Sequence, residues 1–121
     1  MKKTTSARTE SVVSEQVQPK VSLLPNVRVL GKTYKIQSLP EHVMDGEFGA
    51  CNYAYQLIKY NQKLAPDELK DTLLHEMVHV LDYGMQLGLK EKQVHTIATG
   101  VYSLMKDNKE FFEWVMSDAD V

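Results

Sequence analysis

The spacing of apolar residues changes once along this chain of 121 residues, close to Pro66. Upstream of that point apolar and polar residues alternate, as at Val27, Arg28 and Val29, with the period of two that is typical of half-buried strands. Downstream, apolar residues recur every three or four positions, which is the period of an amphipathic helix. Strands that precede helices, instead of alternating with them, predict an α+β domain.

The upstream half is expected to form a small antiparallel or mixed sheet of about three strands. Alternating runs flank Gly31-Lys32, and a two-residue link that begins with glycine is typical of a tight hairpin. Pro40 closes this hairpin, and the stretch 45–49 is expected to be a loop. Aromatic and β-branched residues favour a third strand over residues 51–60.

The downstream half is expected to contain three helices. The first is predicted over residues 66–83, because a proline suits the first helical turn and Gly84 is well placed to end the helix. The second is predicted over about 90–106 and the third over about 109–116. The aromatic residues of the third helix are expected to cap the core: Phe111, Phe112 and Trp114.

Residues 1–22 are expected to form a disordered tail. Ser, Thr, Lys, Glu and Gln dominate this segment, so burial cannot offset the entropy lost on ordering it. Residues 23–121 are then expected to form one domain, since dividing so short a chain would leave neither part with a sizeable core.

Charge and composition argue against two classes of partner. The net charge is −2 and the basic residues are scattered, so no nucleic-acid surface is predicted. No apolar run approaches the roughly 20 residues that span a bilayer, and no apolar block follows Met1-Lys2-Lys3. We therefore expect a cytoplasmic protein with no membrane partner. The single cysteine, Cys51, agrees with a reducing compartment and is expected to be a half-buried strand residue.

The first predicted helix contains the pattern H-E-x-x-H at His75, Glu76 and His79. Residues four apart lie one turn apart on the same helical face, so both imidazoles can reach a single ion. Zinc accepts such nitrogens. Glu76 projects beside that ion, where it can take a proton from a zinc-bound water as the general base of a hydrolysis. The pattern predicts His75 and His79 as metal ligands and Glu76 as the catalytic residue.

The remaining surface of this helix supports the interpretation. One face carries an apolar stripe that is expected to pack on a core, and the opposite face carries the two histidines and Asp82, where a surface helix normally carries Lys and Glu. Asp82 is either an acceptor for the second N–H of a ligating histidine or an ordinary helix-end acid. The stripe consists of Leu73, Met77, Val80 and Leu81.

A catalytic zinc usually has three protein ligands and one open position. On the second predicted helix, Glu91, His95, Ala98 and Tyr102 form one line. Either Glu91 or His95 can complete the site, and spacing leaves both open. Tyr102 is either a hydrogen-bond donor to an oxyanion or a packing residue. The neighbouring apolar stripe is expected to pack on the first helix: Val94, Ile97, Val101, Leu104 and Met105.

Residues 72–108, with the H-E-x-x-H pattern and the following Glu91-Lys92-Gln93-Val94-His95, resemble small metallopeptidase-like proteins of phages and mobile elements. These proteins are relatives of the ImmA/IrrE-like zincins, within the gluzincin group, and the resemblance is weaker over residues 27–60. It implies a minimal zincin-like domain and a glutamate as third ligand, in a pattern E-x-x-x-[DN] whose last residue supports the site. The resemblance thus favours Glu91 as the zinc ligand, with His95 either supporting it in place of Asp or Asn or substituting for it.

The analogy with zincins also implies that an edge strand near residues 53–58 holds an extended peptide by β-addition. Two functions from different classes remain open. The first is a zinc metallopeptidase that acts on a protein or peptide substrate. The second is a non-catalytic, zinc-stabilised protein-interaction module, which would keep the metal ligands without depending on Glu76. The presence of Glu76 favours the peptidase, and the sequence specifies neither a cleavage preference nor an oligomeric state.

Overall fold

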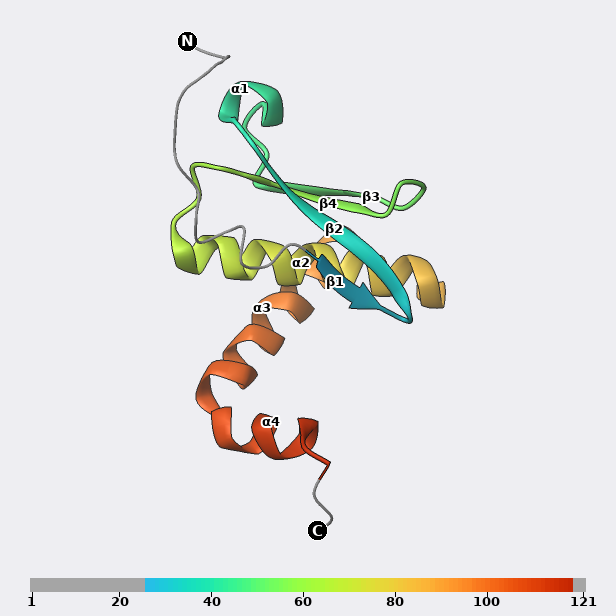
Figure 1. The fold of residues 1–121 in the computed structure, drawn as a ribbon, viewed down its shortest axis with the longest axis vertical. Coiled ribbons are helices and arrows are strands. Elements are labelled where there is room, and N and C mark those ends of the chain that lie inside the picture. The colour runs from blue at the N-terminus through green and yellow to red at the C-terminus, as the bar shows by residue number, and fades with distance from the viewer. Residues whose placement is uncertain (1–25, 119–121) are drawn as a thin grey trace.

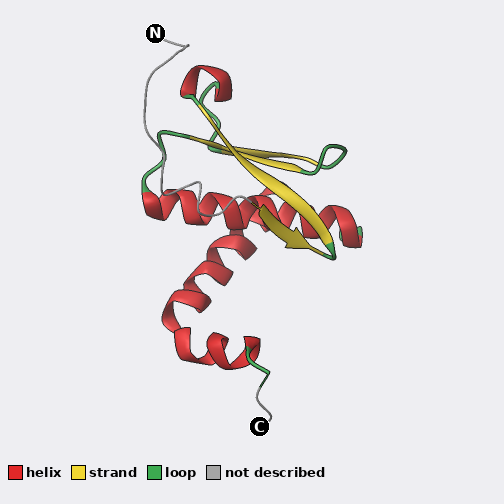
Figure 2. Ribbon diagram, viewed as in Figure 1, coloured by secondary structure: helices red, strands yellow, loops and turns green. Residues whose placement is uncertain are grey.

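A four-stranded mixed sheet lies on one side of a long helix, and two further helices lie on its other side (Figure 1). The computed structural model describes residues 26–118, so the tail predicted over residues 1–22 lies outside the described residues. The predicted α+β class is confirmed, with one short helix among the strands that was not predicted (Figure 2). In chain order the elements are β1 (Asn26–Val29), β2 (Lys32–Leu39), α1 (Glu41–Met44), β3 (Gly49–Asn52), β4 (Leu57–Asn61), α2 (Pro66–Met85), α3 (Glu91–Asp107) and α4 (Lys109–Met116).

β1 and β2 form the predicted hairpin, but its turn lies one residue earlier than predicted. Val29 pairs with Lys32, so the two turn residues are Leu30 and Gly31. Both have positive φ, 51° and 82°, which is the type I′ geometry that follows the twist of paired strands. Glycine therefore takes the second turn position, and Leu30 adopts the left-handed conformation at the first. β2 ends directly before Pro40, as predicted.

The single third strand predicted over residues 51–60 is wrong, because this stretch contains most of a second hairpin. β3 and β4 are antiparallel, with Asn52 opposite Leu57. The Oδ1 atom of Asn52 accepts the backbone N–H of Tyr55 at 2.9 Å, so an asparagine side chain closes the turn where no glycine or proline signals one. Tyr53 and Tyr55 lie in this turn, and because tyrosine favours strands, the predicted strand ran across it.

The second hairpin inserts its later strand into the sheet and leaves its earlier strand at the edge. The strand order is β1-β2-β4-β3, with β4 parallel to β2 and Ile36 opposite Ile58. Four strands are present over residues 26–118, against about three predicted. The edge strand beside α2 is therefore β3, and the prediction of an edge over residues 53–58 is wrong, because Ile58 is fully buried in the interior strand.

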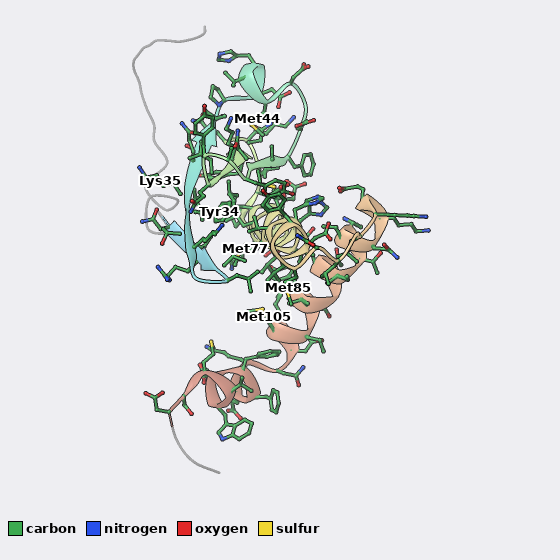
Figure 3. All side chains as sticks on the ribbon, turned by 90° about the vertical axis from the view of Figure 1, so that its right-hand side faces the viewer. Tyr34, Lys35, Met44, Met77, Met85 and Met105 are labelled. Carbon is green, nitrogen blue, oxygen red and sulfur yellow. The ribbon has the colours of Figure 1, made fainter. Side chains whose placement is uncertain are left out.

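α2 packs its apolar stripe on the sheet, as predicted. Tyr34 of β2 is directed toward this helix, whereas the neighbouring Lys35 is directed away from it (Figure 3). This alternation gives the sheet one buried face. The buried core and the partly buried residues packed around it come from both layers: Val29, Tyr34, Ile58 and Val80, with Leu73, Met77 and Leu81.

α2 begins at Pro66, as predicted, but ends two residues later than predicted, at Met85. Gly84 does not end the helix. A Cβ atom at this position would lie 2.7 Å from Cδ1 of Leu30, so the glycine makes room for the side chain of the β1–β2 turn. Gln86 ends the helix instead, in the left-handed conformation with φ 55°.

α3 and α4 occupy nearly the predicted residues, but their packing differs from the prediction. Val94 and Ala98 are each only 1 % exposed where α3 lies against α2. The remainder of the predicted stripe is exposed, because the line of Glu91, Ala98 and Tyr102 faces α2 in its place. The exposed members of the stripe are Ile97, Val101, Leu104 and Met105.

α4 contributes no buried residue, so the prediction that its aromatic residues cap the core is wrong. α3 leads away from α2 and the sheet, and α4 therefore stands clear of both (Figure 1). Phe111 is 56 % exposed and Trp114 is 46 % exposed. Within residues 26–118, no helix has both the length and the apolar character needed to cross a bilayer.

Gly49 marks the closest approach of β3 to α2, and its replacement tests that packing. An added Cβ would lie 2.7 Å from Cγ2 of Thr72, 3.1 Å from Oε2 of Glu76 and 3.2 Å from the backbone oxygen of Lys59. We expect Gly49→Ala to lower the free energy of unfolding by about 1–3 kcal/mol, because side chains and backbone must shift to admit the methyl group. Urea unfolding followed by circular dichroism measures this change.

Gly100→Ala is the matched control. Gly100 lies inside α3, and nothing lies within 4 Å of an added Cβ. Alanine in an open helical position is expected to raise the free energy of unfolding by about 0.5–1 kcal/mol. A Gly49→Ala protein as stable as the wild type would contradict the close approach described here.

Candidate metal centre

Two imidazoles of α2 and one carboxylate of α3 converge on the same point. His75 and His79 lie one helical turn apart, and Nε2 of each ring faces a different oxygen of Glu91, at 2.8 Å and 2.9 Å respectively. The histidine side chains are only 16 % and 23 % exposed, whereas the Glu91 side chain is 68 % exposed. The histidine side of the group is therefore mostly buried in the protein, and its carboxylate side is exposed to solvent.

These three residues can hold a metal ion. One ligand atom from each lies within 4.8 Å of the others, and no other such group of three occurs among residues 26–118. Of the two residues that the sequence left open, the structure brings Glu91 into the group. His95 lies nearby, with its ring centroid 5.9 Å from that of His75, but does not belong to it.

The connection between α2 and α3 determines where Glu91 lies. Oδ1 of Asp82 accepts the backbone N–H of Leu89 at 3.1 Å, and the backbone N–H of Lys90 donates to the side chain of Gln93 at 2.8 Å. Together these bonds fix the end of the loop and the first turn of α3, where Glu91 is the first residue. Asp82 thus supports the site through the loop, and no hydrogen bond to a histidine is observed for it.

Glu76 lies beside the group of three and is 5 % exposed. Its carboxylate faces the backbone of β3, as the 3.1 Å separation from a Cβ built on Gly49 indicates. Burial raises the pKa of Glu76, while a hydrogen bond with the thiol of Cys51 and the nearby His79 and His75 act in the opposite direction. An acid in these surroundings holds its proton more readily than an exposed glutamate does.

A cleft of about 570 Å³ lies over the group of three and over Glu76. Residues of β3 and the loop before it form one wall, and residues of α2 and α3 form the other. The sequence-based prediction missed the β3 wall, because it assigned Gly49 to a loop over residues 45–49, whereas Gly49 begins β3 and, having no side chain, allows the close approach of α2. The residues of the β3 wall are Glu47, Phe48, Gly49, Ala50, Cys51 and Tyr53.

Cys51 and Tyr53 connect the β3 wall to the site. Cys51 is partly exposed, as predicted for a strand cysteine. Burial raises the pKa of its thiol to about 11, so the thiol carries its proton at neutral pH and can donate a hydrogen bond to Glu76. Burial also raises the pKa of Tyr53, whose hydroxyl donates to the backbone oxygen of His79 at 3.4 Å. The Tyr53 ring stacks on Tyr83, with centroids 4.0 Å apart.

Tyr102 lies outside the cleft. Its hydroxyl donates to Oδ1 of Asp67 at 3.2 Å, near the start of α2, and it is not among the residues that line the cleft. The structure therefore places Tyr102 in the contact between α2 and α3, as the packing interpretation predicted. Asp71 does line the cleft, and its Oδ1 atom is buried without a hydrogen-bond partner.

Comparisons with protein-family models, with curated proteins and with solved structures gave no match.

Metal content tests the assignment of Glu91. We expect Glu91→Ala to weaken the binding of a divalent metal ion by at least about 100-fold. The site then loses one of its three ligands, and loss of a residue that only supports a ligand already costs about 10–100-fold. His95→Ala serves as the matched control and is expected to have a much smaller effect. Elemental analysis after dialysis measures the metal content of both variants, and titration calorimetry measures their affinity for the metal. Loss of the metal from His95→Ala with retention in Glu91→Ala would contradict the assignment.

Proposed function

We propose that this protein is a zinc-dependent metallopeptidase of the zincin type, which hydrolyses peptide bonds in a protein or peptide substrate. The observation that carries the proposal is the position of Glu76 next to a convergent pair of imidazoles and a carboxylate, at the floor of an open cleft. The resemblance of residues 72–108 to small phage and mobile-element metallopeptidases also supports this proposal.

The donor set fits zinc. Two histidine nitrogens and one carboxylate oxygen are the three protein ligands of one common class of catalytic zinc site, in which the fourth position stays open. Donor atoms bound to zinc at about 2.0–2.1 Å in a tetrahedral arrangement lie roughly 3.3 Å apart. The observed separations of 2.8 Å and 2.9 Å, each to a different oxygen of Glu91, are up to about half an ångström shorter than this, and Glu91 is exposed enough to move.

His75, His79 and Glu91 would hold a zinc ion, which would supply Lewis acidity to a substrate carbonyl and to a water molecule. Glu76 is placed to accept the proton of that water on its carboxylate and to pass it to the departing amine. Cys51 holds the Glu76 carboxylate through its thiol. The buried position of Glu76 suits a group that gains and loses a proton in each cycle, because burial disfavours its permanent ionisation.

The edge strand β3 offers a place for the substrate. Gly49, Ala50 and Cys51 line the cleft, and among residues 26–118 β3 pairs with β4 alone. Its other side is available to an extended peptide, which can add to a sheet edge through backbone hydrogen bonds that are independent of sequence. Such a peptide would run along the cleft wall opposite His75 and His79.

The substitution Glu76→Gln separates hydrolysis from metal binding. We expect this variant to keep its zinc and to lose at least about 10²-fold in kcat/KM, because glutamine cannot accept the proton. Hydrolysis of unfolded casein or of a peptide library measures the activity, and elemental analysis measures the zinc. Glu110→Gln, at an exposed position of α4, is the control and should retain full activity. Undiminished hydrolysis by Glu76→Gln would refute the proposed mechanism.

A non-catalytic, zinc-stabilised interaction module is the second candidate, and one observation favours it. The three candidate ligands lie on two different helices, so an ion bound between them would fasten α3 to α2. Metal binding to the folded state alone adds directly to folding stability. This candidate shares the metal site with the peptidase and differs from it only in having no turnover.

Thermal melting with a chelator measures how much the ion stabilises the fold. An ion present at about 1,000 times its Kd contributes about 4 kcal/mol, so we expect a chelator to lower Tm by more than about 10 °C. The Glu91→Ala protein should show little change in Tm under the same treatment. An unchanged wild-type Tm would argue against an ion between the helices, whereas a large fall combined with no hydrolysis of any substrate would favour the module over the peptidase.

A further inference from the structure

α3 carries an apolar face that nothing in the described chain covers. Positions 97, 101, 104 and 105 recur with helical spacing and so lie on one side of the helix. The stripe begins at the buried Val94, where α3 touches α2, and becomes exposed as α3 leads away from the other elements (Figure 1). Met105 lies well along this projecting part (Figure 3). The exposed fractions are 42 % for Ile97, 36 % for Val101, 56 % for Leu104 and 40 % for Met105.

α4 carries a second exposed apolar face. Phe111, Trp114 and Val115 recur at three- and four-residue spacing, and the rings of Phe111 and Trp114 lie 5.7 Å apart. No residue of this eight-residue helix is buried. A helix this short is marginally stable in water unless its apolar face packs against another surface. We therefore expect the apolar face of α4 to be covered by another part of a protein. Its exposed large apolar residues are Phe111, Trp114, Val115 and Met116, at 56 %, 46 %, 53 % and 71 % exposure.

The size of this surface matches one half of a stable dimer. At roughly 200 Å² for a large apolar residue, eight such residues at 36–71 % exposure present on the order of 800 Å². A monomer rarely exposes more than about 300–600 Å² in one apolar patch. Each partner in a specific interface of standard size contributes about 800 Å².

We propose that the exposed faces of α3 and α4 form the interface of a homodimer with a second copy of this chain. Charges beside the apolar residues have both signs, with Lys106 and Lys109 close in sequence to Glu110 and Glu113. Two copies related by a two-fold axis can set the lysines of one against the acids of the other, as an isologous interface requires. The net charge of −2 per chain leaves little repulsion between copies.

The dimer lies away from the cleft, so it can be tested without any assumption about catalysis. Sedimentation equilibrium of the full chain over micromolar to submillimolar concentration is expected to give a mass approaching twice 13.8 kDa. Leu104→Glu is expected to give a monomer at every concentration. Leu104 is 56 % exposed, so a glutamate there leaves the fold of the single chain intact, which circular dichroism verifies.

Ser103→Glu is the matched control, because Ser103 is exposed and lies on the side of α3 opposite the apolar face. This variant is expected to dimerise like the wild type. Trp114 is the single tryptophan of the chain, so its fluorescence reports directly on the interface. Its emission maximum is expected to move to longer wavelength as the wild type is diluted and to stay at long wavelength in Leu104→Glu.

Three outcomes would overturn the proposal. A wild-type mass of 13.8 kDa at all concentrations would mean that the surface is covered by other residues of the same chain or by a different protein. A dimer that survives Leu104→Glu unchanged would mean that the copies associate elsewhere. Dimerisation with no change in Trp114 emission would exclude α4 from the interface.

Discussion

The packing of α2 between the sheet and α3 is the interaction on which the other features depend. One face of this helix buries Val80 and its neighbours on the sheet, within the main hydrophobic cluster of the described residues. The other face presents His75 and His79 to Glu91. Because a helix is rigid along its length, fixing the first face on the sheet also fixes the directions of the two imidazoles.

Glu76 lies where these two faces meet, and its surroundings come from distant parts of the chain. Because Gly49 has no side chain, the Glu76 carboxylate can lie close to the backbone of β3. The thiol of Cys51 forms a hydrogen bond with this carboxylate. Two histidines on the other side favour the ionised form, whereas burial disfavours it. The burial outweighs the opposing influences and leaves the pKa of Glu76 raised, and perturbed carboxyl groups of this kind are often found at functional sites.

The sequence predicted the helical half of the fold more accurately than the strand half, for physical reasons that particular residues illustrate. Pro66 and the 3.6-residue period define α2, and four-residue spacing alone aligns His75 with His79, because helical geometry is local. The turn after Asn52 escaped prediction because an asparagine side chain forms it among residues that favour strands. Pairing between β2 and β4, which makes β3 the edge strand, involves residues far apart in sequence and leaves no local pattern.

The candidate site was likewise predicted in part. Its three candidate metal ligands were proposed from spacing and resemblance, and the structure brings them together. The face of α3 that packs on α2 was predicted wrongly. Ala98 is small and lets the two helices approach along the line that contains Glu91 and Tyr102, whereas the larger apolar stripe was expected to make this contact. That choice leaves the stripe of α3 and the aromatic residues of α4 exposed.

The short loop between α2 and α3 confines the donor atoms to a helical hairpin, between positions 75 and 91. The contacts that join this hairpin to the sheet connect residues farther apart in sequence, since a Cβ at Gly49 would lie against Glu76 and a Cβ at Gly84 against Leu30, and they close longer loops when the chain folds. The convergence of the two imidazoles with Glu91 is therefore a property of one helical hairpin, whereas the wall beside Glu76 comes from a strand that precedes both helices in the chain.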